Sequence, residues 1–181
     1  MRVIRLPRQD NGDTHRDGRD FRDQRLVRAD FSGRQLDGAR FDGANLRQAS
    51  LVGTILTRAS FERARVVRAD LTGARLGASR LAHADLSGVT LAGADLSGAD
   101  LTGANLFGAD LRGADMSDAC LTRVTLEAAT LRGAILCGAD LSGARIASAD
   151  LRDIDADEDT LWPTGLPWPR RSDPLQMSLR P

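Results

Sequence analysis

The side chains of this sequence that most readily bind metals or act as nucleophiles are two histidines and two cysteines, and they are widely separated. His15 lies near the N-terminus, His83 lies near the middle, and Cys120 and Cys137 follow in the second half. None of them has a partner at the short Cys and His spacing of a zinc site, and two cysteines are too few for a disulfide framework. The sequence also lacks a phosphate-binding glycine loop and a nucleophile elbow. We therefore expect a protein that is not an enzyme and that holds no metal and no cofactor.

The distribution of charge is more informative than the histidines and cysteines, because the balance of basic and acidic residues differs between the two halves of the chain. The chain has 25 basic residues, all of them arginine, and 25 acidic residues, so its formal net charge is zero. Residues 1–80 contain 17 arginines and 10 acids, whereas residues 81–160 contain 5 arginines and 14 acids. The first half can therefore attract phosphate or another anion, and the second half can present carboxylates to a basic partner.

A five-residue repeat must position these charges. An apolar residue occurs at every fifth position from Phe21 to Leu151, which gives 27 consecutive pentapeptides. Alanine fills 20 of the 27 positions two residues before the apolar centre, and Asp or Asn fills 12 of the 27 positions directly before it. Glycine fills 14 of the 27 positions two residues after the centre. Because this period fits neither a helix nor a regular strand, it predicts short extended segments that alternate with tight turns.

Alternation within each extended segment predicts which residues point inward. The alanine and the apolar centre share the inner face, and the Asp or Asn between them points outward. The glycine position is expected to adopt the positive φ of a type II turn. One corner column is glycine six times, in steps of 20 from Gly33 to Gly133, whereas the column that starts at Arg28 has glycine only twice. This longer period predicts a coil with four sides and unequal corner types.

The two central pentapeptides, residues 94–98 and 99–103, read ADLSG and ADLTG. Together with the other copies over residues 19–153, they resemble the tandem A(D/N)LxG repeats of the pentapeptide-repeat family. The resemblance implies an all-β fold, a right-handed quadrilateral β-helix. At 20 residues per coil, the 27 pentapeptides correspond to about seven coils.

Residues 20 apart stack in columns in such a fold, and this gathers the charges into two candidate surfaces. We predict an acidic face for docking a partner, made of Asp95, Asp100, Asp115, Asp118 and Asp140. We predict a basic patch on another side of the N-terminal half, made of Arg25, Arg28, Arg47, Arg65 and Arg68. Each surface has a simpler interpretation, since an aspartate before the centre can bond the N–H groups of its turn and arginines can form an ordinary solvated face. Only the collective charge of each surface argues for a function.

The segments outside the repeat are expected to close the ends of the solenoid. Residues 1–18 are interpreted as a polar N-terminal arm or cap, and residues 154–181 as a C-terminal cap and tail. The candidate cap or dimer contacts of the C-terminal segment are Leu161, Trp162, Leu166 and Trp168. Dimerisation through this end is known in the pentapeptide-repeat family, so the resemblance implies a possible homodimer.

The expected function is that of a rigid, non-enzymatic scaffold that docks a protein partner through its charged outer faces. The resemblance implies a sharper alternative, a DNA mimic that modulates or protects DNA gyrase, a type II topoisomerase, as quinolone-resistance members of the family do. A second alternative is binding of an anion or a nucleic acid by the basic patch, although no outward aromatic side chain lies among its arginines to stack on bases. No apolar run is long enough to span a membrane and no signal peptide is visible, so we expect a cytoplasmic bacterial protein with no membrane partner.

Overall fold

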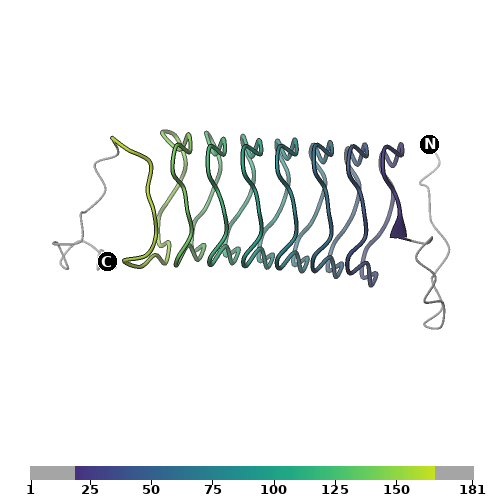
Figure 1. Ribbon diagram of the computed structural model, residues 1–181, viewed down its shortest axis with the longest axis horizontal. Helices are drawn as coiled ribbons and strands as arrows, with labels where there is room; N and C mark the ends of the chain where they lie inside the picture. Colours follow the sequence, from purple (N-terminus) through teal and green to yellow (C-terminus); the bar gives the residue numbers. More distant parts are fainter. Residues whose placement is uncertain (1–18, 166–181) are drawn as a thin grey trace.

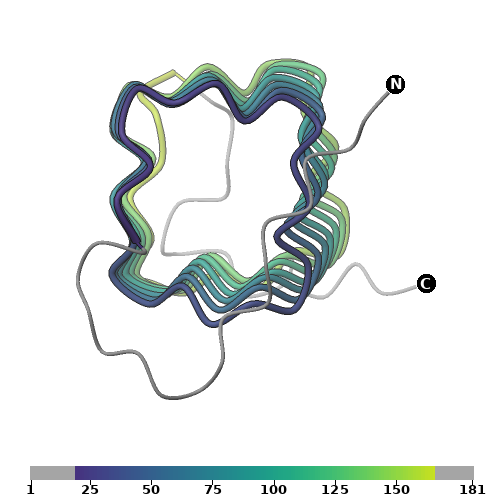
Figure 2. The same ribbon diagram turned by 90° about the vertical axis from the view of Figure 1, so that its right-hand side faces the viewer.

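The computed structural model describes residues 19–165, which wind into a rod of stacked coils (Figure 1). Viewed along the rod, each coil has four sides (Figure 2). Isolated parallel bridges join residues 20 apart on successive coils, from the Asp20–Arg40 bridge to the Ile135–Asp155 bridge. Within residues 19–165 no α-helix and no extended strand is formed, because each side contributes a single bridging residue per coil. The architecture is the expected all-β, four-sided β-helix.

One central pentapeptide illustrates how the backbone is satisfied. The Leu96 N–H donates to the Asp115 carbonyl of the following coil at 2.7 Å, and the Asp95 N–H donates to the Ala74 carbonyl of the preceding coil at 3.0 Å. The Ala99 N–H closes the turn onto the Leu96 carbonyl at 3.0 Å. Because each coil bonds both of its neighbours in this way, the backbone inside the rod is held by its own hydrogen bonds.

The interior of the rod is filled by the residues that the repeat predicts. The apolar centres from Leu26 to Ile146 are all buried, and so are the alanines that precede them from Ala29 to Ala144. Near the N-terminal end, the rings of three phenylalanines stack in one column, with centroids separated by 4.7 and 4.8 Å: Phe21, Phe41 and Phe61. Each coil therefore buries about four large side chains, each of which contributes roughly 1.5–3 kcal/mol.

The corners have positive φ, as the turn chemistry predicts. Every residue two positions after an apolar centre, from Asp23 to Asp153, has a positive φ except Ser148. The φ values of Arg28 and Arg68 are 60° and 54°, close to the 64° of Gly88 in the same column. The glycine-poor column therefore has the same sign of φ as the glycine-rich columns. Its arginines adopt the left-handed region although this conformation costs about 1–2 kcal/mol for a residue with a Cβ.

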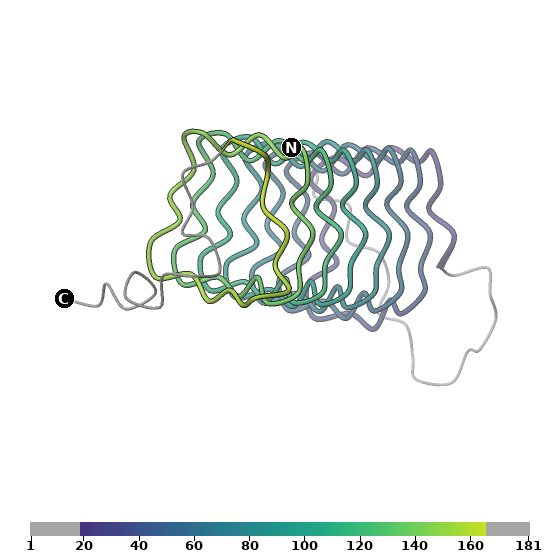
Figure 3. The same ribbon diagram turned by 60° about the vertical axis from the view of Figure 1, so that its left-hand side comes forward.

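The C-terminal end departs from the 20-residue step by one residue. Asp140 bridges Leu161, and the preceding Thr160 is buried, where its hydroxyl donates to the Leu136 carbonyl at 3.0 Å. Trp162 follows and packs, half-buried, against the hydrophobic core. Figure 3 shows this last turn of the chain stacked on the end of the rod.

Candidate functional site

The Asp and Asn residues that directly precede an apolar centre all bond the turn that follows them. Asp115 is typical, because its Oδ1 accepts from the Ser117 backbone N–H at 2.9 Å and from the Ser117 hydroxyl at 2.6 Å. The same carboxylate or amide oxygen accepts the N–H two residues on in all twelve cases: Asp20, Asp30, Asn45, Asp70, Asp85, Asp95, Asp100, Asn105, Asp110, Asp115, Asp140 and Asp150. A structural role therefore accounts for the presence of an aspartate at any one of these positions.

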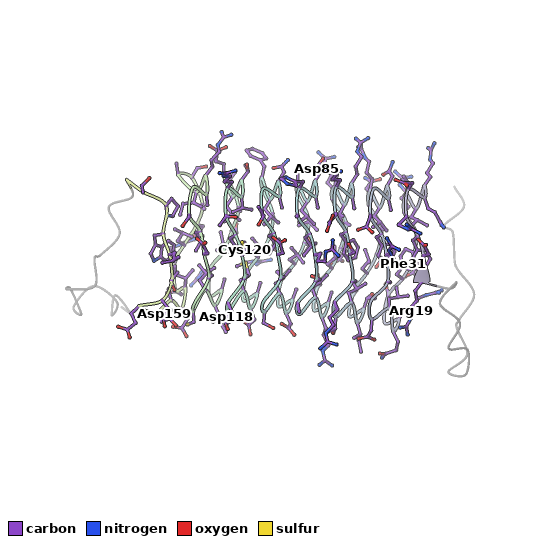
Figure 4. All side chains as sticks on the ribbon, in the orientation of Figure 1. Arg19, Phe31, Asp85, Asp118, Cys120 and Asp159 are labelled. Atoms are coloured by element: carbon purple, nitrogen blue, oxygen red, sulfur yellow. The ribbon has the colours of Figure 1, made fainter. Side chains whose placement is uncertain are left out.

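The acidic face lies on two adjacent sides of the rod and on the corner between them. Asp95 and Asp115 are neighbours in one column, on successive coils. Asp100 and Asp140 lie two coils apart in the column of the next side, so the structure does not bring this pair into contact. Asp118 occupies the corner column, at the lower edge of the rod in Figure 4. The five residues thus form one continuous surface rather than one cluster.

The charges of the acidic face are not neutralised. In the part of the chain that the structure describes, none of its five carboxylates lies within 4 Å of an arginine nitrogen. The four that cap turns use Oδ1 to do so, and their Oδ2 accepts no hydrogen bond from residues 19–165. A partner can therefore contact this second oxygen without disturbing the turn.

The aspartates on another side of the rod behave differently, because arginine neutralises two of them. Arg112 lies 2.6 Å from Asp110, and Arg152 lies 2.6 Å from Asp150. Hydrogen bonds from Arg152 lower the pKa of Asp150 to about 2, and Arg112 lowers the pKa of Asp110 in the same way. The C-terminal half of this side therefore presents paired charges, which carry little net field.

The basic patch is also continuous. Asn45 lies between Arg25 and Arg65 in one column, and Gln48 accepts a hydrogen bond from Arg28 Nε at 2.8 Å in the neighbouring corner column. Four members form no ion pair with any described residue: Arg25, Arg47, Arg65 and Arg68. The patch thus keeps its positive charge, and it lies on a different side of the rod from the acidic face.

The two cysteines are free thiols in different environments. Cys120 lies in the column of Asp100 and is hydrogen-bonded to the hydroxyls of Thr102 and Thr122, at 3.2 and 3.5 Å. Burial raises the pKa of Cys120, but these hydrogen bonds outweigh burial and lower the pKa below its ordinary value. Burial and nearby acids raise the pKa of Cys137. Both cysteines are half-buried.

The candidate cap residues divide into three groups. Trp162 packs against the core, whereas Leu161 is 53% exposed. Leu166 and Trp168 lie outside the described residues.

No group of His, Cys, Asp or Glu side chains within residues 19–165 could hold a metal ion. The same residues include no helix that is both long and apolar enough to cross a bilayer.

The columns of the acidic face continue into arginines that the sequence analysis did not single out. Arg75 is the neighbour of Asp95 on the adjoining coil, and Arg80 is the neighbour of Asp100. Arg58 lies in the corner column of the same surface. Reading the sequence in steps of 20 residues would have identified these arginines. The net charges of the two halves do not show them, because they do not say in which columns arginine is followed by aspartate.

A family model described as pentapeptide repeats matches this chain in four segments, of which the first two overlap: residues 25–63, 39–77, 79–118 and 119–155. No curated protein sequence matches the chain. Among solved structures, the chain is similar to QnrB1, a plasmid-mediated fluoroquinolone resistance protein, with 18% identity and a TM-score of 0.53. The match covers 77% of this chain and 92% of QnrB1. At this identity the likeness shows the fold alone.

A second structure is HetL, a pentapeptide repeat protein involved in heterocyst differentiation regulation in the cyanobacterium Nostoc sp. strain PCC 7120. It is 28% identical, and the match covers 82% of this chain and 93% of HetL with a TM-score of 0.46. A third is a pentapeptide repeat protein of the Arabidopsis thaliana thylakoid lumen, 27% identical, with 72% and 77% of the two chains covered and a TM-score of 0.30.

Proposed function

Because this chain belongs to the pentapeptide-repeat family, we propose that it is a non-enzymatic scaffold whose acidic face docks a protein partner. The observation that carries the proposal is the contrast between the sides of the rod. The five carboxylates of the acidic face have no arginine partner among the described residues, whereas Asp110 and Asp150 are each paired with one. A surface that leaves its charges unpaired is suited to a basic partner.

The rod presents these carboxylates in fixed positions. Each turn-capping aspartate is held through Oδ1 by the N–H of its own turn, on a backbone bonded to the coils on both sides. Binding a partner therefore requires little additional ordering of the scaffold, and the entropic cost of association is correspondingly small.

The sharper form of the proposal is that the partner is a type II topoisomerase, DNA gyrase, and that the acidic face imitates DNA. Asp95 and Asp115 lie on successive coils, which are about 4.8 Å apart in a β-helix. Asp100 and Asp140 form a second row in the column of the next side, two coil steps apart. Rows of carboxylates at these intervals resemble the phosphates of one DNA strand in projection. This form predicts that the protein binds gyrase and does not bind DNA.

Substitution of aspartate by asparagine tests the acidic face without disturbing its turns. Asn45 and Asn105 already occupy the same repeat position and cap the same turn. We expect Asp95→Asn, Asp115→Asn and Asp118→Asn, combined in one protein, to abolish any effect on supercoiling by purified gyrase, with and without a fluoroquinolone. The control is Asp70→Asn, which removes the charge of a turn-capping aspartate on another side of the rod.

The result decides between the two forms of the proposal. Inhibition or drug protection by the wild type and the Asp70→Asn control, but not by the triple variant, supports gyrase. If gyrases from several hosts do not respond, the topoisomerase form is wrong. Pull-down with the same three proteins then tests the general scaffold, which fails if the triple variant captures everything that the wild type does.

The second candidate is anion or nucleic-acid binding by the basic patch. It rests on Arg25, Arg47 and Arg65, which form no ion pair with any described residue and lie close together on one side of the rod. Nucleic-acid binding through these side chains should weaken steeply with salt. It should also disappear when all five arginines of the patch become serine, which a fluorescence anisotropy titration with labelled DNA measures.

Three further features belong to the proposal. They are the right-handed path of about seven coils, a cytoplasmic location, and a homodimer formed through the C-terminal end. The exposure of Leu161 beside the capping Trp162 supports the dimer contact. Sedimentation of a Leu161→Ser variant tests it, because a dimer that uses this end should dissociate.

A further inference from the structure

Three arginine and aspartate pairs on and beside the acidic face are arranged symmetrically along the rod, with the arginine on one side of a midpoint and the aspartate on the other. In the corner column the order is Arg58, Ala78, Gly98, Asp118, so that an arginine and an aspartate lie one and a half coils on either side of the same midpoint. On one of the two sides that meet at this corner, Arg75 and Asp95 lie half a coil before and half a coil after a midpoint. Arg80 and Asp100 are arranged in the same way on the other side. The three midpoints lie within a quarter of a coil, about 1.2 Å along the rod.

From this pattern we infer that the surface is self-complementary and binds a second copy of the chain in antiparallel orientation. A two-fold axis that lies in the plane of contact and crosses the rod at right angles places each column on the same column of the partner, with its direction reversed. Arg58 of one copy then meets Asp118 of the other, and the Arg75 and Asp95 pair and the Arg80 and Asp100 pair meet in the same way. Because every contact occurs twice, the interface is closed and the assembly stops at a dimer.

The centre of this surface allows two rods to approach closely. Between Arg58 and Asp118 the corner carries only small residues: Gly77, Ala78, Ser97 and Gly98. Figure 4 shows Asp118 at the lower edge of the rod, at the corner that borders the side with Cys120. The long arginine side chains can therefore reach across to the partner's carboxylates while the two corners lie against each other.

The charges at this surface are available for a partner. Arg58 and Arg75 are exposed and form no ion pair with any residue in 19–165, although Arg75 and Asp95 lie on adjoining coils. Asp95 instead bonds Ser97 through Oδ1, and its Oδ2 lies over Gly77. Arg80 is paired with Glu62 in the same protomer, so it contributes less than the other two arginines.

The strip is three columns wide, which makes it smaller than the roughly 800 Å² per partner of a stable interface. Its contacts are also mainly charged, and exposed ion pairs are individually weak. We therefore expect a dimer that forms at high protein concentration and low salt and that dissociates as salt shortens the Debye length from about 10 Å at 0.1 M to about 3 Å at 1 M.

Sedimentation velocity of the full chain up to 500 µM tests the inference. We expect a concentration-dependent dimer in 20 mM NaCl whose dissociation constant rises at least tenfold in 500 mM NaCl. Arg58→Asp and Asp118→Arg should each weaken the dimer at least tenfold. Both substitutions are compatible with the fold, because Asp23 and Asp153 have positive φ at equivalent corners, and so does Arg123.

The decisive sample is an equimolar mixture of the two single variants. In a heterodimer of these two chains, an aspartate faces an arginine at both copies of the contact. The mixture should therefore dimerise more strongly than either variant alone. The matched control is Arg68→Asp, which makes the same charge change at a corner on another side and should dimerise like the wild type.

Three results overturn the inference: no dimer at 500 µM in low salt, single variants that dimerise like the wild type, or a mixture that dimerises no more strongly than either variant alone. A dimer that survives both substitutions would use another surface, such as the C-terminal end. The samples contain no partner protein, so the outcome is independent of the docking function proposed above. If both hold, the second copy covers Asp95, Asp100 and Asp118, and self-association competes with docking.

Discussion

The turn-capping aspartates combine a structural and a surface role, and substitution at Asp115 separates the two. Asp115→Ala removes the acceptor for the Ser117 N–H and hydroxyl, which should cost about 1 kcal/mol of the free energy of unfolding. Asp115→Asn keeps the cap and removes repulsion from Asp95 on the adjoining coil, so it should be at least as stable as the wild type. Urea denaturation measures both. Equal losses in the two variants would show that the charge, and not the cap, stabilises the turn.

A matched pair of corner residues tests the cost of positive φ. Ala78 and Gly98 are successive members of one corner column, with φ of 53° and 61°. Ala78→Gly should stabilise the protein by up to about 1 kcal/mol because it relieves left-handed strain, less the added flexibility of the unfolded chain. Gly98→Ala should destabilise it by a similar amount, although a Cβ there meets nothing within 4 Å. Thermal unfolding would contradict this account if both changes moved the midpoint in the same direction.

The ion pair between Asp150 and Arg152 should be visible in the pH dependence of stability. Arg152 lowers the pKa of Asp150 from 3.8 to about 2 in the folded protein. A carboxyl with a lowered folded pKa stabilises the fold above the ordinary pKa, and this contribution is lost as the pH falls from about 4 to about 2. In Arg152→Ser the Asp150 pKa should return towards 3.8. Carboxyl NMR titration measures both proteins, and identical titration midpoints would exclude the ion pair.

At the scale of the elements, the C-terminal cap should stabilise only the coils next to it. Trp162 packs half-buried against the end of the core, so Trp162→Ala should cost about 2 kcal/mol locally. Because each coil contacts only its neighbours, the loss should decay along the rod. Hydrogen exchange should accelerate at the Leu136 and Leu141 amides and stay unchanged at Leu46. Uniform acceleration along the chain would show instead that the whole rod unfolds as one unit.

The coils were predictable from the sequence because every pentapeptide repeats the same pattern of inward, outward and turn residues. The inward positions of leucine and alanine, the outward position of the aspartates and the positive φ of the corners all follow from a period of five and a super-period of 20. The 21-residue step from Asp140 to Leu161 was not predictable, because the repeat has already ended there. Nor was the contrast between Asp150, which is paired with Arg152, and Asp95, which is not, because it depends on side-chain conformation.

At the scale of the whole molecule, the rotation of the second half about the rod axis relative to the first half decides which charged residues share a column. The acidic-face residues all follow residue 90, whereas Arg58, Arg75 and Arg80 all precede residue 86. Residues 86–90 between them read LSGVT and carry no charge. Since every pentapeptide forms one side of a coil, removal of these five residues should turn the second half by one side relative to the first and leave the net charge unchanged.

Deletion of residues 86–90 should therefore separate the two proposed surfaces. We expect the variant to fold, with a loss of roughly 1.5–3 kcal/mol for one buried leucine. Its acidic face stays intact, so docking of a partner should persist. Self-association should disappear because Arg58 no longer shares a column with Asp118, nor Arg80 with Asp100, and the one remaining alignment, of Arg75 with Asp100, is too weak alone. As a control, insertion of four further copies of residues 86–90 into the wild-type chain adds a whole coil and keeps the columns aligned, so sedimentation should again detect a dimer. If the dimer survives the deletion or fails to form after the insertion, self-association does not depend on the alignment of these columns.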